Sequence, residues 1–353
     1  MPCVAVIPAR RAERTIRQTL ESLRLGNADF VERVLVVTSS DDPTCAVVRE
    51  WARRDARVGL VLSDAVRSAG AARNDGREAV RRSYGHAAHD VEQDVAQDRE
   101  RRIEQDIKRD IKRDIEHGVT PLLLFVDADC RLEAGGAARL ASELERSAAA
   151  AVTPRIVGTR GLVARARHIL EFKEAASMRT APFAWLPPST VMLCRTHAFD
   201  SAGGFPDLWP GEDLVFTQAL RDGGGVVRRT SDVAAVHDHP RGVLAMLRHQ
   251  WRLGRTAAIA RRMRPMPGSA LAKSALLAPL LFPARTIRIA LWQFREGPAP
   301  LAWTLALSPL LLAGLAVWTS AFTAQVAAGV VGSASAPVDR SAAVVRPGEA
   351  AAA

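Results

Sequence analysis

Short apolar runs alternate with helical patterns in the first part of the chain. Apolar runs occupy residues 4–8, 34–37 and 60–63, and between the first two the apolar positions recur at helical spacing from Thr15 to Leu23. Continuous apolar runs are typical of strands buried on both faces, and strands that alternate with helices build a parallel sheet. The pattern predicts an α/β fold around a doubly wound sheet.

A highly charged segment interrupts this pattern at residues 86–117. It contains an almost repeated RDIK, and its apolar residues recur mostly every four positions: Val91, Val95, Ile103, Ile107, Ile111 and Ile115. This spacing predicts a long helix with one thin apolar stripe. A strict period of four drifts around an α-helix and makes a poor coiled-coil seam. We favour a solvated surface insertion, and a docking arm is the alternative.

The last part of the chain is first basic and then apolar. Residues 297–338 contain no ionisable side chain, and residues 301–331 are long and apolar enough to cross a bilayer, which takes about 20 residues. Residues 271–294 are also apolar but contain Lys273, Arg285 and Arg288. They predict either a second, poorer span or an interfacial helix.

The charge balance favours an anionic partner. Lys and Arg total 48 against 38 Asp and Glu, a formal net charge of +10. Because basic residues precede an apolar anchor, we expect them to face anionic lipid, and no nucleic-acid-binding motif is present. The positive-inside rule then predicts a plasma (inner) membrane protein whose catalytic part is cytoplasmic. The four cysteines form no CxxC pair, which fits a reducing compartment.

The sharpest chemical feature is FVDADC, where a buried strand ends in a pair of carboxylates. The sheet resumes at residues 122–126, and Asp127 and Asp129 follow directly. This edge of an open α/β sheet binds ligands, and two carboxylates on one turn can hold a divalent cation that neutralises a diphosphate. Such a pair can also cap a helix or face water.

Three further motifs carry candidate residues. Arg73 and Asn74, in GAARNDG, can bring a cation and an amide to a phosphate or sugar, or can be ordinary polar residues of a helix start. Glu212 and Asp213 begin a predicted helix, where they either stabilise its dipole or supply Asp213 as a general base. His237 can add an imidazole ligand that favours Mn over Mg, or can be polar surface.

In this order, VIPAR…TLESL, VLVVTSSDDPT, GAARNDG, LLLFVDADC, GGF, GEDLVFTQALRDGG and VHDHP resemble family 2 glycosyltransferases of the GT-A fold. The resemblance covers about residues 3–240 without the insertion. It implies a Rossmann-like mixed sheet flanked by helices, followed here by C-terminal membrane helices. It also implies a nucleotide-sugar donor, a divalent metal (Mn or Mg) and inverting transfer to an acceptor hydroxyl. The apolar anchor favours a lipid-linked or membrane-associated acceptor.

The resemblance also assigns roles to residues. Asp213 is the expected base, and Glu212 shapes the acceptor site. Asp127 and Asp129 are the expected metal ligands, to which the residue pattern adds His237. The expected donor-binding residues are Pro8, Arg10, Asp41, Asp42, Arg73, Asn74 and Asp127.

Two departures from the family pattern affect the donor site. Residues 10–13 read RRAE where the family has an aromatic-Asn-acidic run, and residues 38–42 read TSSDD in place of a DDGS-type turn. Asp41 and Asp42 are the acidic residues that can replace the missing one. A nucleotidyltransferase is an alternative suggested by Arg10 and Arg11, although the glycines of a phosphate loop are absent. The other alternative is a catalytically silent membrane adaptor with the GT-A fold, which uses the insertion to bind a partner.

Together these features divide the chain into six segments. They are an N-terminal half of the catalytic domain with the nucleotide-sugar site (1–85), the charged helical insertion (86–118), a C-terminal half with the metal and acceptor sites (119–240), a basic membrane-proximal helix (241–268), membrane-associated or transmembrane helices (269–332), and a tail predicted to be disordered (333–353).

Overall fold

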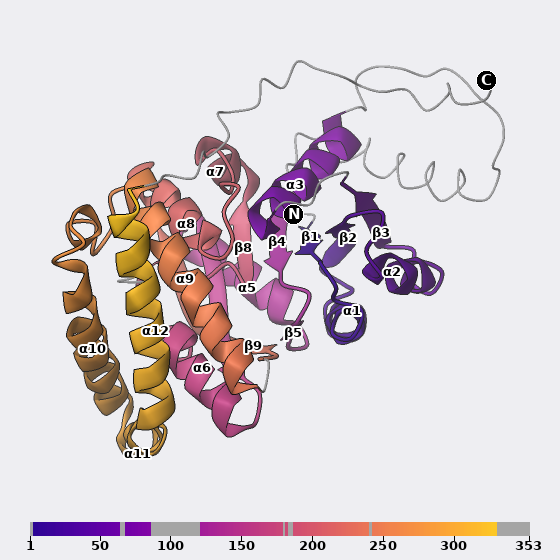
Figure 1. The fold of residues 1–353 in the computed structure, drawn as a ribbon. Helices are drawn as coiled ribbons and strands as arrows, with labels where there is room; N and C mark the ends of the chain where they lie inside the picture. Colours follow the sequence, from indigo (N-terminus) through magenta and orange to yellow (C-terminus); the bar gives the residue numbers. More distant parts are fainter. Residues whose placement is uncertain are drawn as a thin grey trace, which may run out of the picture.

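The computed structural model describes residues 3–63, 68–85, 121–178, 181–182, 186–239 and 242–329. In this part of the chain, helices flank a nine-stranded sheet, and a layer of C-terminal helices packs beside it (Figure 1). The predictions for the charged insertion and for the tail fall outside the described residues. The division into six segments stays a prediction.

The N-terminal half follows the predicted alternation of strands and helices. The parallel strands lie in the order β3-β2-β1-β4, and Ala5 of β1 pairs with Val34 and Leu124 on either side. The strands are β1 (Cys3–Pro8), β2 (Val31–Thr38), β3 (Val58–Leu62) and β4 (Leu122–Val126). The helices are α1 (Ile16–Gly26), α2 (Thr44–Ala52) and α3 (Ala69–Gly85).

Beyond β4 the sheet becomes mixed, as the family resemblance implies. It continues in the order β8-β6-β9-β5, with β8 antiparallel to β4, while β7 pairs with β9 off this path. The strands are β5 (Cys130–Leu132), β6 (Ala151–Gly158), β7 (Ala181–Pro182), β8 (Val191–Arg195) and β9 (Val227–His237). The helices of this half are α5 (Gly136–Arg146), α6 (Leu162–Phe172), α7 (Thr196–Ser201) and α8 (Glu212–Asp222).

Both faces of the sheet are buried. In β1, Ala5 and Ile7 belong to one hydrophobic cluster, whereas Val4 and Val6 belong to another on the opposite face. Alternate side chains of a strand point to opposite faces, so a strand covered on both sides must be apolar throughout. This double burial is the physical reason for the continuous apolar runs in the sequence, and it holds the strand ends that carry the site.

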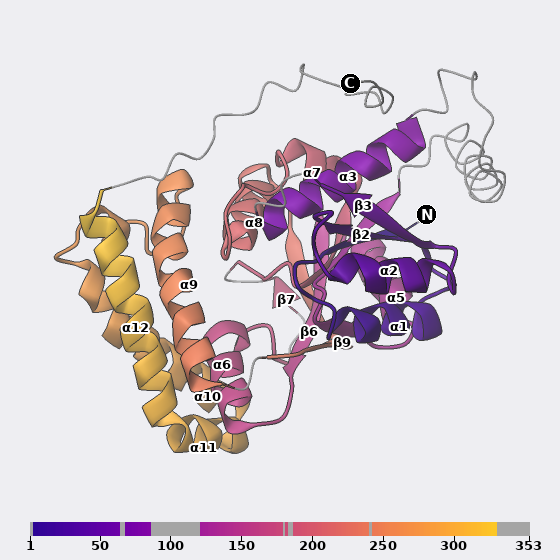
Figure 2. The same ribbon diagram turned by 45° about the vertical axis from the view of Figure 1, so that its right-hand side comes forward.

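The C-terminal helices form a compact layer beside the sheet (Figure 2). In this layer α12 packs along α9 and also contacts α6. A Cβ atom on Gly254 of α9 would lie 2.1 Å from the Trp318 carbonyl oxygen of α12, so the glycine permits the close approach of the two helices. The elements are α9 (Val243–Met263), the 3₁₀ turns η2 (Leu271–Lys273) and η3 (Ala278–Leu280), α10 (Leu281–Glu296), α11 (Pro298–Ala306) and α12 (Ser308–Ala327).

The apolar run at 301–331 is not one continuous helix. It is divided between α11 and α12 at Leu307. Among the described residues, α12 is the one helix long and apolar enough to cross a membrane, and half of its most apolar stretch is buried within the protein. Its buried residues include the polar Gln325, whose side-chain oxygen accepts a hydrogen bond from Arg255 of α9. In this structure α12 is therefore half-buried in the C-terminal layer.

Candidate functional site

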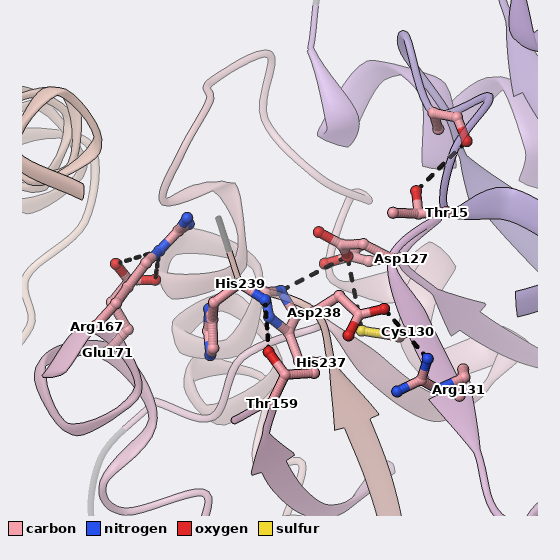
Figure 3. A network of polar contacts seen from close by, with 12 residues as sticks. Thr15, Asp127, Cys130, Arg131, Thr159, Arg167, Glu171, His237, Asp238 and His239 are labelled. Carbon is pink, nitrogen blue, oxygen red and sulfur yellow. Dashed lines mark hydrogen bonds and ion pairs between the residues drawn. The ribbon is translucent and has the colours of Figure 1, made fainter. Parts of the chain in front are cut away.

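The site lies where β4, β5 and β9 meet. Asp127 and Asp129 follow β4 in a tight turn, in which the Cys130 amide donates to the Asp127 carbonyl over 2.9 Å. Strand β5 then pairs with β9 and places Cys130 opposite His237. This pairing brings the His237 Nε2 atom to 3.6 Å from an oxygen of Asp129. Figure 3 shows Asp127, Cys130 and His237 gathered at these strand ends.

The donor atoms at this point suit a divalent cation. Ligand atoms of Asp129, Cys130 and His237 lie within 4.8 Å of one another. Burial, together with the charge of Asp129, raises the pKa of the Cys130 thiol well above its ordinary value. A soft sulfur ligand also suits Mn²⁺ or Mg²⁺ less well than oxygen or nitrogen. A carboxylate oxygen and an imidazole nitrogen remain, with Asp127 beside them, and this oxygen-and-nitrogen set fits Mn²⁺ or Mg²⁺.

Arg73 joins two motifs that are far apart in the sequence. Its side chain, only 2% exposed, donates from Nη2 to Asp127 over 2.5 Å and from Nη1 to Glu212 over 2.6 Å. The guanidinium also lies 4.9 Å from the centre of the Phe205 ring. Arg73 was expected near the donor. In the structure it ties the Asp127 turn to the start of α8.

The start of α8 brings Asp213 to the same place. Gly211 precedes the helix with φ at 105°, a left-handed conformation that a side chain would disfavour. Glu212 then turns inward to Arg73, and one Asp213 oxygen accepts from the Leu214 amide over 2.9 Å. The acidic pair thus occupies the helix start, as the sequence predicts, and both residues also line a cavity.

Two carboxyl groups of the site are poised to titrate near neutral pH. Burial raises the pKa of Asp213 to about 7, with the charge of Glu212 adding to the effect and Arg73 opposing it. Burial likewise raises the pKa of Asp127 to about 7, although Arg73 and His237 act in the other direction. A general base works best when its pKa lies near the working pH, which fits Asp213.

A cavity of about 440 Å³ connects these groups. Of the predicted site residues, its lining contains Arg73, Asp127, Asp129, Glu212, Asp213 and His237. The lining does not include Pro8, Arg10, Asp41, Asp42 or Asn74. The structure thus brings together the metal, base and Arg73 candidates, and it leaves the other donor-binding candidates outside this cavity.

The candidates outside the cavity have other contacts. The Asn74 side chain exchanges two hydrogen bonds with the Phe205 backbone, at 2.7 and 2.9 Å, and so holds the loop before α8. Asp42 accepts from the amides of Thr44 and Arg11 at 2.8 and 2.7 Å. Although burial acts to raise it, these hydrogen bonds hold the pKa of Asp42 below its ordinary value. Asp41 is exposed and free to face a ligand.

Sequence reasoning missed a polar network on the other side of the cavity. Glu171, at the end of α6, binds Arg167, and His249 and Gln250 of α9 contact it at 3.5 and 2.7 Å. Burial opposes its ionisation, but His249 and Arg167 outweigh burial and lower the pKa of Glu171 to about 2. The only signal in the sequence was the charged EFKE at residues 171–174, which ends an otherwise amphipathic helix.

Comparison with known proteins identifies the family. Residues 4–84, which run from β1 almost to the end of α3, match the model of glycosyl transferase family 2. The mannosyltransferase PcManGT from Pyrobaculum calidifontis, in complex with GDP-Man and Mn²⁺, superposes with a TM-score of 0.50 at 18% identity, covering 93% of this chain and 85% of that one. The N-terminal part of the chain thus matches glycosyl transferase family 2, and the fold is of the GT-A class.

A second solved structure, S. aureus TarS 1-349, aligns with the glycosyltransferase at 15% identity and a TM-score of 0.45, covering 93% of this chain and 91% of that one. No curated protein matches the chain in sequence. The likeness to PcManGT at such low identity concerns the fold, and the family match places the enzyme class. The family match favours the glycosyltransferase over the nucleotidyltransferase, and the silent adaptor stays an alternative.

Proposed function

We propose that this glycosyltransferase moves a sugar from a nucleotide-diphospho-sugar to an acceptor hydroxyl, with inversion and with metal assistance. One observation carries the proposal. Asp127, Asp129, His237 and Asp213 come from three separate parts of the chain and line the same cavity. The cavity therefore combines a place for a cation with a base of suitable pKa.

In this mechanism the bond from the sugar's anomeric carbon to the diphosphate breaks as a bond to the acceptor oxygen forms. Asp213 takes the proton of the attacking hydroxyl. Asp129 and His237, with Asp127, would hold the divalent cation, which when bound neutralises charge on the departing diphosphate. Arg73 keeps Asp127 and Glu212 in place, and Glu212 forms part of the wall beside the acceptor.

The nucleoside half of the donor is proposed to lie at the ends of β1 and β2. Pro8 ends β1, Arg10 follows it on the surface, and Asp41 is exposed after β2. The carboxyl edge of an open parallel sheet is where nucleotides bind in α/β folds. PcManGT, whose structure contains GDP-Man and Mn²⁺, supports the class of donor and cofactor.

The function is tested by nucleoside-diphosphate release from UDP-, GDP- and dTDP-sugars with Mn²⁺ or Mg²⁺. We expect release from one donor class, its loss on chelation, and a decrease of about 10²–10³-fold in Asp129→Ala, since a main electrostatic stabiliser of the leaving group is lost. Asp238→Asn is the matched control, because Asp238 bonds Arg131 beside the site and does not line the cavity. The mechanism would be contradicted if Asp129→Ala released nucleoside diphosphate as fast as wild type and if removal of the metal did not change that rate.

We further propose that the protein binds the cytoplasmic face of the plasma membrane by an exposed apolar stripe. On α10 and the turn before it, Leu280, Ile287, Leu291 and Phe294 share one face and are 54–68% exposed. Exposed Lys273 and Arg295 flank this stripe. A helix with an apolar face and basic flanks is suited to the surface of an anionic bilayer. Burial of α12 against α9 favours such surface binding over a span.

Membrane binding is tested by flotation with vesicles that contain phosphatidylglycerol. We expect the double variant Ile287→Glu, Leu291→Glu to lower the vesicle-bound fraction, with affinity falling about tenfold or more as two apolar side chains lose their burial in lipid. Leu25→Glu, at an equally exposed site on α1, is the control and should bind as the wild type does. Unchanged binding of the double variant would exclude the stripe as the membrane contact.

A further inference from the structure

One part of the cavity lining carries more positive charge than the described residues neutralise. Four cations from three elements meet there: Lys173 just after α6, Arg261 of α9, and Arg285 and Arg288 of α10. None of them belongs to the motifs that hold the metal or the base. The sequence analysis placed Arg261 in a basic membrane-proximal helix and treated Arg285 and Arg288 as breaks in an apolar segment.

Glu174 is the carboxylate that these cations share. Its oxygens contact Lys173 at 3.2 Å and Arg288. The neighbouring Glu171 already contacts Arg167, His249 and Gln250. The net charge of this cluster of side chains is therefore positive.

The two other arginines have neutral partners. Arg261 donates to the carbonyl oxygens of Ala257 and Pro267 at 3.0 and 3.1 Å. Arg285 makes no hydrogen bond or ion pair with any side chain that the structure describes, and its guanidinium lies 3.8 Å from the centre of the Trp318 ring. Arg285 thus keeps its donors available at the cavity wall.

The accumulated charge has an electrostatic cost. Burial, together with the charges of Arg261 and Arg288, lowers the pKa of Arg285 to about 9. Burial and Arg288 lower the pKa of Arg261 to about 10. An anion with several acceptor oxygens would relieve both the desolvation and the mutual repulsion of these groups.

We propose that Arg261, Arg285 and Arg288 form a subsite for a phosphate group carried by the acceptor. This inference rests on the proposed function, since it describes the substrate whose hydroxyl would face Asp213. Guanidinium groups match phosphate oxygens with paired hydrogen bonds. The acceptor class is therefore a phosphate ester, either of an apolar alcohol in the membrane or of a water-soluble molecule.

The position of the cluster favours the acceptor over the donor. Arg261 and Arg285 lie on α9 and α10, not at the ends of β1 and β2 where the nucleoside is proposed to lie, and the diphosphate of the donor has its own proposed place at Asp127 and Asp129. Helix α10 also separates the cavity from the exposed apolar stripe. Arg285 and Arg288 line the cavity, while Ile287 and Leu291 are exposed on another face of the same helix. A lipid phosphate at the stripe would need to pass only one helix to reach the cluster.

The test uses farnesyl phosphate, farnesol and inorganic phosphate as probes of the full chain in detergent, by titration calorimetry. We expect farnesyl phosphate to bind wild type and to lose about tenfold or more in affinity in Arg285→Gln and in Arg261→Gln, since each removes charged hydrogen bonds to the phosphate. Arg285→Lys should recover part of the loss. Arg160→Gln, an exposed arginine before α6 that does not line the cavity, is the control and should behave as wild type.

The probes also distinguish the source of the phosphate. Competition by inorganic phosphate at similar concentration would assign the subsite to a soluble phosphate ester, and its failure to compete would assign it to a lipid phosphate. Either result supports the subsite. Equal affinity of Arg285→Gln and wild type for farnesyl phosphate, or equal binding of farnesol, would overturn it.

Donor titrations on the same preparations separate the two proposals. If nucleoside diphosphate with Mn²⁺ binds wild type but farnesyl phosphate does not, the subsite is wrong and the proposed function stands. If farnesyl phosphate binds and no donor binds or turns over, the proposed function is wrong instead. A loss of nucleoside-diphosphate affinity in Arg285→Gln equal to the loss for farnesyl phosphate would assign the cluster to the donor and overturn the acceptor subsite.

Discussion

Replacing Asp213 by asparagine should lower kcat for sugar transfer by about 10²–10⁴-fold, the usual contribution of a positioned general base. Asparagine keeps the shape of the side chain and can still accept from the Leu214 amide, but it cannot take a proton. Because the pKa of Asp213 is about 7, wild-type activity should rise with pH through neutrality as the carboxylate forms. The pH–rate profile of wild type, measured by nucleoside-diphosphate release, checks this.

The same substitution should stabilise the fold at neutral pH. The pKa of Asp213 is raised from 3.8 to about 7, so between these values the folded protein binds a proton that the unfolded chain releases. The free energy of unfolding of the wild type therefore decreases as pH rises through this window. Asparagine stays neutral at every pH, so Asp213→Asn does not show this decrease. At pH 8 we expect Asp213→Asn to have a higher Tm than wild type, by roughly 2–4 °C for each kcal/mol by which its free energy of unfolding increases.

Asp222→Asn is the matched control for Asp213. Asp222 ends the same helix, is exposed and bonds Arg264 at 2.8 Å, so its substitution should change neither rate nor pH profile. A variant Asp213→Asn that retains wild-type kcat would show that another group deprotonates the acceptor. A lower Tm in that variant would show that the Asp213 charge is favourable in the fold.

Replacing Arg73 by glutamine should destabilise the protein by about 3–5 kcal/mol, the cost of breaking a buried ion pair and leaving charge without a partner. Arg73 is 2% exposed and bonds Asp127 and Glu212. Without it Glu212 loses its ion-pair partner and Asp127 keeps only the neighbouring His237 as a counter-charge, and both carboxylates lose their fixed positions for catalysis. The urea midpoint at pH 7 measures the loss of stability.

Arg77→Gln is the control, because Arg77 lies one turn along the same helix and its ion pair with Asp200, at 2.7 Å, is to a half-exposed carboxylate. Exposed pairs contribute at most about 1 kcal/mol. Arg73→Lys, which keeps the charge but not the paired geometry, should lie between wild type and Arg73→Gln. Equal urea midpoints for Arg73→Gln and Arg77→Gln would show that Asp127 and Glu212 do not depend on Arg73.

The strands and the carboxylate pair could be predicted because local pattern suffices for them. A strand buried on both faces must be apolar along its length, so β1, β2 and β4 are visible in the sequence. Asp127 and Asp129 follow β4 without an intervening loop, and Glu212 and Asp213 begin α8 directly after Gly211. Their positions therefore depended on elements that the sequence already indicated.

The partners of Arg73 and Asn74 could not be predicted in this way. Both were expected to face the donor, yet Arg73 bonds Glu212 across 139 residues and Asn74 bonds the Phe205 backbone across 131. A local pattern shows that a polar residue stands near a turn, but not which distant group will neutralise it. That choice depends on how α3 packs against the start of α8.

The sequence by itself determined that this protein is an α/β glycosyltransferase with a pair of carboxylates directly after β4, because short-range periodicity and motif order carry that information. Only the tertiary structure decided that α12 packs against basic α9, and that Arg261, Arg285 and Lys173 converge on the cavity of Asp213. The composition of an apolar helix does not say which helix it packs against. The packing of α9, α10 and α12 comes from contacts between residues far apart in the chain.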